Sequence, residues 1–376
     1  PHAAERPGER TEGGMMVEVR LEGVGKRYGS VIAVDKVDLT VADKEYVTVL
    51  GPSGCGKTTL IRMIAGIIEP TDGKVLIDGK DMTGVPIEDR DIGYVFQNIA
   101  LFPHLTVQDN VSYGPRARDL PPEEQVRVSR RFLEMVKLLD KMGMLPGELC
   151  GGEQQKVSLA RALSSGSKLL LLDEPLSALD SRVRVDLRYE LRRLAKELGL
   201  TTIHVTHDQE EAQSVSDRIV LMRAGTVVET GTPEELYTHP KKIFTANFIG
   251  ETNLLEGWVL EIKDGVSVIE LRNGGKVKVN QSNHPVGDAV VISVRPEFVF
   301  LADEGMRAKV TAITYMGTYW RITANTEDEE EVAFDSVTYD ENLLTIGREV
   351  YLAVNPKAAV LYPRPEDGVQ EAIKLE

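Results

Sequence analysis

The sequence of 376 residues predicts an α/β domain built around a phosphate-binding loop (P-loop), followed by a smaller all-β domain. Three observations predict this organisation. An apolar strand runs directly into the glycine-rich segment Gly51–Thr58. Strands and helices then alternate, with a helical insertion at about 105–150. Beyond Gly250 helical periodicity stops, and short β-branched runs separated by turn pairs follow.

The elements of the first domain follow from periodicity and from turn residues. Alternating apolar and polar residues predict half-buried strands, whereas continuous apolar runs predict buried ones. Glycine and proline mark where helices stop. The predicted strands are Val17–Glu22, Val37–Val41, Tyr46–Leu50, Lys74–Asp78, Ile92–Phe96, Leu169–Asp173, Thr202–Thr206 and Arg218–Met222. The predicted helical stretches are Lys57–Gly66, Thr106–Asp140, Glu153–Ser164, Arg182–Leu198 and Asp208–Ser216. This alternation is typical of a parallel sheet with helices on its faces.

The second domain begins after a join in Gly231–Asn253, where Pro233–Tyr237 is predicted to be a short helix. We place the boundary between residues 240 and 241, which gives domains at 15–240 and 241–376. Turn pairs such as Asp264-Gly265 and Asn273-Gly274 favour a small barrel or sandwich. The predicted strands are Val266–Leu271, Lys276–Val279, Ala289–Val294, Lys309–Thr314, Arg321–Thr323 and Glu349–Val354. Residues 1–14 are polar and are interpreted as a cloning remnant or a disordered leader.

Composition narrows the class of function. The chain carries 44 basic and 59 acidic side chains, a net charge of −15, which argues against a nucleic-acid-binding surface. No run of 18 apolar residues is present, so we expect no membrane span, and the N-terminus lacks the apolar core of a secretory signal. Two cysteines, Cys55 and Cys150, do not form a disulfide framework and fit a reducing, cytosolic setting.

The segment Gly51–Thr58 matches the pattern G-x-x-x-x-G-K-[ST] in full, with a strand before it and a helix after it. Its glycines let backbone N–H groups surround phosphate oxygens at a helix N-terminus. Lys57 is expected to reach the β- and γ-phosphates, and the hydroxyl of Thr58 is expected to bind Mg²⁺. The alternative, an ordinary glycine-rich turn, does not explain the flanking strand and helix.

Two carboxylates end the apolar strand Leu169–Asp173. Ligands of open α/β sheets bind at the carboxyl ends of the strands. Asp173 therefore suits a Mg²⁺ shell, and Glu174 suits a general base for attack on the γ-phosphate. An Asp-Glu pair alone usually lies in a solvated turn. The buried strand before this pair and the phosphate-binding loop upstream favour a functional role instead. Taken singly, Tyr28, Gln97 and His207 are typical of structural residues.

Residues 17–250 resemble the nucleotide-binding domain of ATP-binding cassette (ABC) ATPases. Leu149-Cys150-Gly151-Gly152-Glu153 is similar to the family signature Leu-Ser-Gly-Gly-Gln and lies between the phosphate-binding loop and the carboxylates. Residues 251–376 resemble more weakly the TOBE domain, with OB-like barrels, of importer ATPases. Arg295-Pro296-Glu297 and Asn355–Leu361 are the best local matches. The implied fold is an α/β P-loop nucleotide-binding domain with a helical insertion and a C-terminal all-β, OB-like domain.

The resemblance implies a role for each motif. ATP is expected to contact Tyr28, through adenine stacking, and Gly51, Pro52, Ser53, Gly54, Cys55, Gly56, Lys57, Thr58 and Thr59. Mg²⁺ is expected at Thr58, Gln97 and Asp173, and the implied catalytic residues are Glu174, the switch histidine His207 and the Q-loop residue Gln97. The signature Leu149, Cys150, Gly151, Gly152 and Glu153 is expected to complete the site of a second subunit. The D-loop is Ser177, Ala178, Leu179 and Asp180.

The implied function is ATP hydrolysis that powers a binding-protein-dependent importer of a small solute. The implied partners are a second nucleotide-binding subunit, in a homodimer or a heterodimer, two transmembrane permease subunits and, indirectly, a solute-binding protein, with no nucleic acid. The location would be the cytoplasmic face of the membrane. Sugar is slightly favoured as solute over polyamine, ferric iron or an oxyanion. Asn98–Leu105 is the candidate permease contact; the alternative is a loop packed into its own core.

Two alternatives belong to other classes. A soluble ABC ATPase acting on nucleic acids is disfavoured by the single cassette, by the net charge and by the acidic run Glu327–Glu331. The β-rich domain could also act as a regulatory module that binds a ligand or a signalling protein, or it could be a structural brace for the dimer.

Cys150 departs from the family pattern, which has serine there donating to the γ-phosphate. A thiol is a weak donor. Losing a hydrogen bond to a charged group costs about 1.5–3 kcal/mol, or about 10- to 150-fold in rate. The amides of Gly151 and Gly152 remain, so we expect a smaller loss. The alternative is that Cys150 is a tolerated near-isostere. In the implied dimer Cys150 faces Cys55 of the other subunit, which predicts a cross-link on oxidation.

Overall fold

The computed structural model describes residues 17–272, 274–338 and 344–375, so the predicted leader 1–14 and Asn273 lie outside the described residues. Its contacts divide the chain into two compact units. The first comprises residues up to Arg218 together with Ala224–Thr226. The second comprises Ile219–Arg223 and the chain from Val227 onward. The domain boundary between residues 240 and 241 stays a prediction.

The first unit contains four parallel strands in the spatial order β3-β8-β7-β6. Every residue of β3, β7 and β8 is buried, and in β7 this burial on both faces gives the continuous apolar run Leu169–Leu172 instead of an alternating pattern. Because the strands are parallel, the loops after them emerge at one edge of the sheet. The strands are β3 (Tyr46–Leu50), β6 (Ile92–Val95), β7 (Leu169–Asp173) and β8 (Thr201–Thr206).

An antiparallel sheet in the order β2-β1-β4-β5 accompanies these strands. The predicted strands at residues 17–22 and 37–41 are parts of a longer hairpin that reaches the turn at Gly29-Ser30. Register shifts between Leu21 and Arg27 interrupt the alternation of apolar and polar residues along β1. The strands predicted from that alternation are therefore shorter than the observed ones. The strands are β1 (Val19–Tyr28), β2 (Val31–Val41), β4 (Asp72–Ile77) and β5 (Lys80–Asp81).

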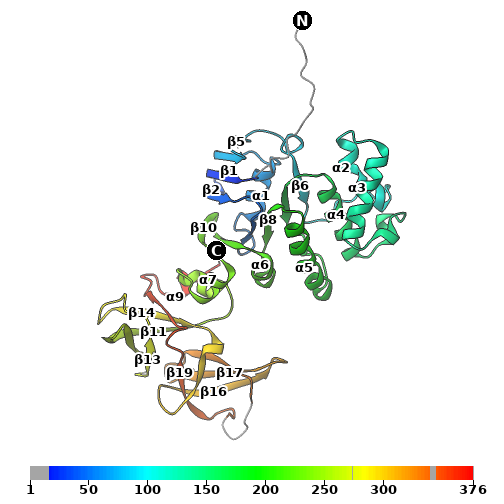
Figure 1. Cartoon of the computed structure of the whole chain (residues 1–376). Coiled ribbons are helices and arrows are strands. Elements are labelled where there is room, and N and C mark those ends of the chain that lie inside the picture. The colour runs from blue at the N-terminus through cyan, green and yellow to red at the C-terminus, as the bar shows by residue number, and fades with distance from the viewer. Residues whose placement is uncertain (1–16, 273, 339–343, 376) are drawn as a thin grey trace. The chain divides into compact units, whose positions relative to one another are not determined.

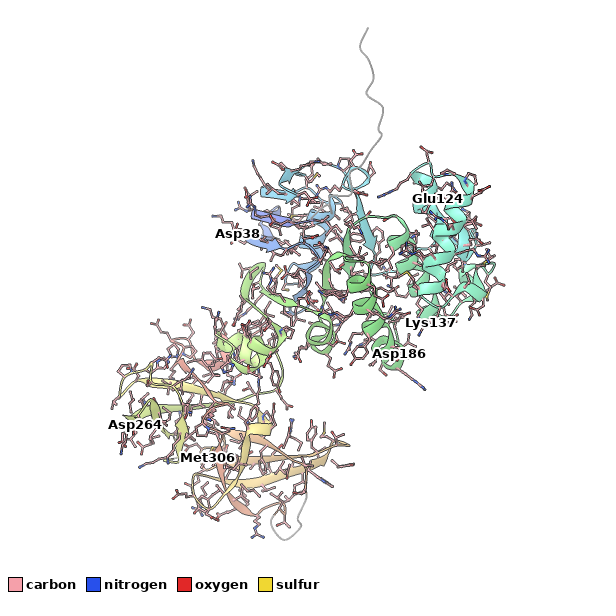
Figure 2. The ribbon with its side chains drawn as sticks, viewed as in Figure 1. Asp38, Glu124, Lys137, Asp186, Asp264 and Met306 are labelled. Carbon is pink, nitrogen blue, oxygen red and sulfur yellow. The ribbon has the colours of Figure 1, made fainter. Side chains whose placement is uncertain are left out.

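The helical insertion is present, and the predicted helical stretch Thr106–Asp140 contains two α-helices. Thr106 caps the first by accepting the N–H of Asp109, and Pro121-Pro122 opens the second. Glu123 and Glu124 lie in the first turn of α3 and complement its helix dipole. Figure 2 labels Glu124 on this helix. Figure 1 shows α2 and α3 beside α4, with which they share an apolar core. The helices of this unit are α1 (Lys57–Ala65), α2 (Val107–Ala117), α3 (Pro122–Met135), α4 (Gly151–Ser164), α5 (Ser181–Glu197) and α6 (Gln209–Val215).

The second unit is β-rich, as predicted. Two five-stranded sheets, β13-β12-β11-β14-β20 and β15-β19-β16-β17-β18, share one apolar core. The strands are β9 (Arg218–Arg223), β10 (Thr226–Gly231), β11 (Asn253–Lys263), β12 (Val266–Leu271), β13 (Lys276–Val279), β14 (Ala289–Val294), β15 (Val299–Ala302), β16 (Met306–Tyr315), β17 (Trp320–Thr326), β18 (Glu331–Ser336), β19 (Glu349–Val354) and β20 (Val360–Pro363). The helices are α7 (Pro233–Thr238), α8 (Ile243–Phe248) and α9 (Val369–Ala372).

The Arg295 side chain connects the helices α7 and α8 to the end of β14. Its guanidinium donates to the backbone oxygens of Tyr237 at 3.0 Å, Ala246 at 2.6 Å and Glu251 at 3.1 Å. Burial lowers the pKa of this arginine. The motif at 295–297 is therefore a structural anchor. Within the described ranges, no helix is long and apolar enough to cross a membrane.

Candidate active site

The loop between β3 and α1 curls around Lys57. This lysine is only 4 % exposed, and its Nζ donates to the backbone oxygens of Gly51 and Pro52, each at 2.8 Å. Gly56 has a φ of 103°, and a Cβ there would lie 2.3 Å from the backbone oxygen of Ala33. Only glycine fits this position. The loop thus presents a lysine and the N-terminus of α1, which together favour an anion.

Thr58 and the buried carboxylate of Asp173 meet at this loop. The Thr58 hydroxyl donates to Oδ1 of Asp173 at 3.2 Å. The Tyr94 hydroxyl donates to Oδ2 at 3.1 Å, and Arg62 Nε lies 3.5 Å from the same oxygen. Burial raises the pKa of Asp173, whereas Tyr94, Arg62 and Thr58 oppose that rise. A bound cation would favour the charged carboxylate further.

These oxygens fit a magnesium ion held jointly with a substrate. Hydroxyl and carboxylate oxygens are ligands that Mg²⁺ prefers, and it is usually bound by one or two carboxylates plus phosphates. In the described part of the chain, no group of three His, Cys, Asp or Glu side chains could hold a metal ion alone. Gln97, the third predicted ligand, contacts Glu174, so its role toward a metal stays a prediction.

The Glu174 carboxylate contacts Gln97, which lies just beyond β6, and His207, which directly follows β8. Its Oε2 accepts from Gln97 Nε2 at 3.1 Å and lies 3.2 Å from His207 Nδ1. Its backbone N–H donates to the oxygen of Val205 in β8 at 2.9 Å. Glu174 has a φ of 46°, which is rare outside glycine. Such strain is typical of functional positions. The structure therefore brings Gln97, Glu174 and His207 together at one edge of the sheet.

The signature opens helix α4. Cys150 is its N-cap residue, is exposed, and donates its backbone N–H to Oε2 of Glu153 at 3.2 Å. A side-chain hydrogen bond from Lys141 holds the pKa of Glu153 below its usual range. Leu149 is buried. These contacts fix the start of α4 while Cys150 faces solvent.

The two signature glycines differ in their surroundings. A Cβ on Gly152 would lie 2.6 Å from Cγ1 of Val183 in α5, whereas one on Gly151 would meet only Leu179 Cδ2 at 3.7 Å. Gly152 therefore lets α4 approach α5 closely. This packing role was missed from the sequence, which indicated only a phosphate-binding role for the pair.

The D-loop follows Glu174. Ser177 donates its hydroxyl to the backbone oxygen of Glu174 at 3.0 Å, and Asp180 caps α5 by accepting the N–H of Val183 at 3.1 Å. Leu179 is buried, while Ala178 and Asp180 are exposed. Hydrogen bonds thus hold the segment at Ser177 and at Asp180, while Ala178 and Asp180 remain accessible to solvent.

Two predicted nucleotide contacts differ in exposure. The Tyr28 ring, at the end of β1, is 49 % exposed, and Lys26 Nζ lies 5.3 Å from its centroid. The Cys55 side chain is buried, and burial raises the pKa of its thiol against the charge of Lys57. A raised pKa lowers the thiolate fraction that disulfide formation needs. The cross-link with Cys150 stays a prediction.

The segment Asn98–Leu105 has features of both alternatives. Leu101 packs against the apolar core of the first unit. The ring of Phe102 lies 4.7 Å from that of Tyr113 and 5.4 Å from the guanidinium of Arg161. The two residues after it, at 103–104, are exposed. Leu101 and Phe102 therefore pack against the first unit, while residues 103–104 are exposed to solvent.

Sequence reasoning missed Tyr94 and Arg62, which both contact Asp173. Tyr94 lies within an apolar strand, where a tyrosine is typical of the core, so no local signal marks it. Arg62 was detectable, because it follows Thr58 by four residues and so shares its helix face.

Comparisons with known proteins found two matching family models and several similar proteins. Residues 34–177 match the family model of the ABC transporter, and residues 292–361 match that of the TOBE domain. The spermidine/putrescine import ATP-binding protein of Thermobifida fusca is 40% identical over 359 residues, which cover 92% of this chain and 93% of that protein. The protein of the same name from Rubrobacter xylanophilus is 44% identical, covering 84% of this chain and 85% of its own. The Fe(3+) ions import ATP-binding protein of Fusobacterium nucleatum is 38% identical, covering 96% of both.

A solved structure of a dimeric bacterial ABC transporter cassette is similar in fold. It is 32% identical, with a TM-score of 0.52, and covers 57% of this chain and 98% of its own. A post-hydrolysis structure of the same dimeric cassette, bound to ADP and Pi, matches equally well.

Proposed function

The chain belongs to the ABC transporter family, among the ATP-hydrolysing subunits of importers, and from this premise we propose that it powers the uptake of a polyamine such as spermidine or putrescine. The names of its relatives support this solute, with ferric iron as the second candidate. The expected preference for sugar finds no support in them. Uptake of labelled spermidine by vesicles that contain the assembled importer tests the proposal; uptake of ferric iron instead would reassign the solute.

ATP is proposed to bind along the carboxyl edge of the parallel strands. The loop Gly51–Thr58 would surround the phosphates with N–H groups, and Lys57 would neutralise their charge. The exposed ring of Tyr28 would stack on adenine. Mg²⁺, when bound, would neutralise charge on the phosphates, and Thr58 and Asp173 would hold it, joined by Gln97.

Hydrolysis is proposed to depend on Glu174. Its carboxylate would take a proton from a water molecule as the water oxygen attacks the γ-phosphorus, and ADP would leave with the electron pair of the broken P–O bond. Gln97 and His207 would orient that carboxylate. The observation that carries this proposal is the contact of Glu174 with both groups, directly after Asp173, which contacts Thr58.

Replacement of the base tests this mechanism. Glu174→Gln keeps the shape of the side chain but cannot take the proton. We expect ATP binding to persist and the hydrolysis rate to fall at least about 100-fold. Glu88→Gln, at an exposed position outside the site, is the matched control and should hydrolyse ATP normally. Hydrolysis at the parental rate in Glu174→Gln would assign the base elsewhere.

Two copies are proposed to share each ATP, with the loop Gly51–Thr58 of one facing the signature of the other. The exposure of Cys150 and Gly151 supports this arrangement, as does the dimeric state of the similar cassette. A helix N-terminus favours an anion, so the start of α4 suits a phosphate. The dimer is proposed to dock on two permease subunits at the cytoplasmic face of the membrane. The open side of Asn98–Leu105 would make that contact, and a solute-binding protein would deliver the solute.

A further inference from the structure

The loop after β7 and the segment after β8 are joined by one arginine side chain. Arg184 lies in the first turn of α5, four residues beyond the cap Asp180. Its Nη2 donates to the backbone oxygen of Leu179 at 3.0 Å, and its Nη1 donates to Oδ2 of Asp208 at 3.3 Å. Asp208 directly follows His207. One guanidinium therefore contacts both the D-loop and the residue beside His207.

Asp208 is itself held firmly. Its Oδ1 accepts the N–H of Glu211 at 3.0 Å, which caps α6, and its own N–H donates to Oγ1 of Thr206 at 3.0 Å. The Thr206 hydroxyl in turn donates to the buried carboxylate of Glu211 at 2.6 Å. The residues on both sides of His207 are thus held by hydrogen bonds, which fix the backbone from which the imidazole extends.

Together, these contacts and the backbone form a closed series of connections that begins and ends at Glu174. The chain runs from Glu174 to Leu179, the guanidinium of Arg184 joins Leu179 to Asp208, and His207 returns to Glu174 through the 3.2 Å separation of Nδ1 and Oε2. The D-loop backbone at Leu179 and the His207–Glu174 pair are therefore linked through a single guanidinium.

We propose that Arg184 is a positioning residue that couples the D-loop to the His207–Glu174 pair, so that hydrolysis depends on where the D-loop lies. The exposed D-loop residues Ala178 and Asp180 are the points at which a second copy of the chain would act. This inference rests on the proposed function, because it assigns Arg184 an effect on ATP hydrolysis through His207.

Arginine suits this role for a geometric reason. Its planar fork directs two N–H groups at two acceptors at once, whereas a lysine ammonium is a flexible point charge. The Nε of Arg184 is buried and without a hydrogen-bond partner among the described residues, so the side chain is held through its two Nη atoms. A lysine can reach one of the two acceptors but cannot hold them at a fixed separation.

The first test measures ATP hydrolysis by Arg184→Lys and Arg184→Met. We call the contacts of Arg184 with Leu179 and Asp208 the tether. We expect kcat to fall about tenfold, while KM for ATP stays within about twofold, because the tether acts on the reacting groups and not on the phosphate-binding loop. Arg188→Lys is the control: Arg188 lies 3.8 Å from the same Asp208 carboxylate and 3.6 Å from Glu210, so it touches one end of the tether only. Its kcat should stay near the parental value. Thermal unfolding of each variant shows that it is folded.

The second test asks whether the effect passes through His207. In a His207→Ala background, Arg184→Met should cause no further loss of kcat, measured as single-turnover release of labelled phosphate. Unchanged kcat in both Arg184 variants, or an equal fold loss in both backgrounds, would overturn the tether alone. Parental hydrolysis by His207→Ala itself would instead overturn the proposed role of His207, and with it the tether.

Discussion

Gly152→Ala is the substitution whose cost the structure defines most closely. The new Cβ would lie 2.6 Å from Cγ1 of Val183, where an apolar contact needs about 3.5–4.0 Å. Val183 is β-branched and lies in a helix, so its side chain has little freedom to turn away. Overpacking of this kind costs about 1–3 kcal/mol, and replacing a helical glycine by alanine returns about 0.5–1 kcal/mol. The net loss is at most about 2.5 kcal/mol, which for a unit of this size lowers Tm by up to about 10 °C.

Gly151→Ala is the matched control, because its Cβ would meet only Leu179 at an ordinary 3.7 Å. Gly151→Ala gains the same stabilisation from replacing a helical glycine by alanine and introduces no clash. Its Tm should therefore equal the parental value or rise by a few degrees. Calorimetry of both variants, and of Gly152→Ala combined with Val183→Ala, measures the difference. A Gly152→Ala protein as stable as Gly151→Ala, or a clash that Val183→Ala does not relieve, would refute the close packing of α4 on α5.

Three further predictions concern single side chains. Cys150→Ser should raise the ATPase rate by up to about tenfold, because a hydroxyl donates better than a thiol; an unchanged rate would remove the claim. Tyr94→Phe removes a donor to the buried Asp173 carboxylate and should cost about 1.5–3 kcal/mol in unfolding free energy, seen as a lower urea midpoint; a parental midpoint would contradict this. Burial would raise the pKa of Glu211, but electrostatic attraction to His204, 3.2 Å away, and the hydrogen bond from Thr206 hold it below the usual value. The stabilisation is therefore present above the ordinary Glu pKa of about 4.3 and is lost as pH falls through the lower folded value, so Glu211→Gln should lower Tm at pH 7 and match the parent in acid. A Tm difference that did not change with pH would argue against this.

The parallel strand β7 and the loop after it were predictable because burial on both faces leaves the continuous apolar run Leu169–Leu172. The strand Leu169–Asp173 could be assigned from five residues, and its direction places Asp173 and Glu174 at the ligand-binding edge. Gln97 and His207 are far apart in the sequence, and only the resemblance to ABC ATPases singled them out; their contacts with Glu174 became visible in the structure.

Contacts between elements could not be predicted, because they depend on packing that no local pattern records. The fit of Gly152 against Val183 requires the relative placement of two helices. Strand β11 was missed for a related reason: a Cβ on its Gly257 would lie 2.5 Å from the backbone oxygen of Glu270, so this glycine permits a close strand approach where the sequence pattern suggests a break.

Mixing two inactive chains tests most directly the claim that each ATP is shared between copies. One chain carries Lys57→Ala in the loop, and the other carries Gly151→Asp in the signature. In a mixed dimer, one site holds both defects, and the other combines an intact loop with an intact signature. We expect that neither chain alone hydrolyses ATP and that the mixture regains a substantial part of the parental rate. If each site instead used the loop and signature of one chain, the mixture would stay inactive.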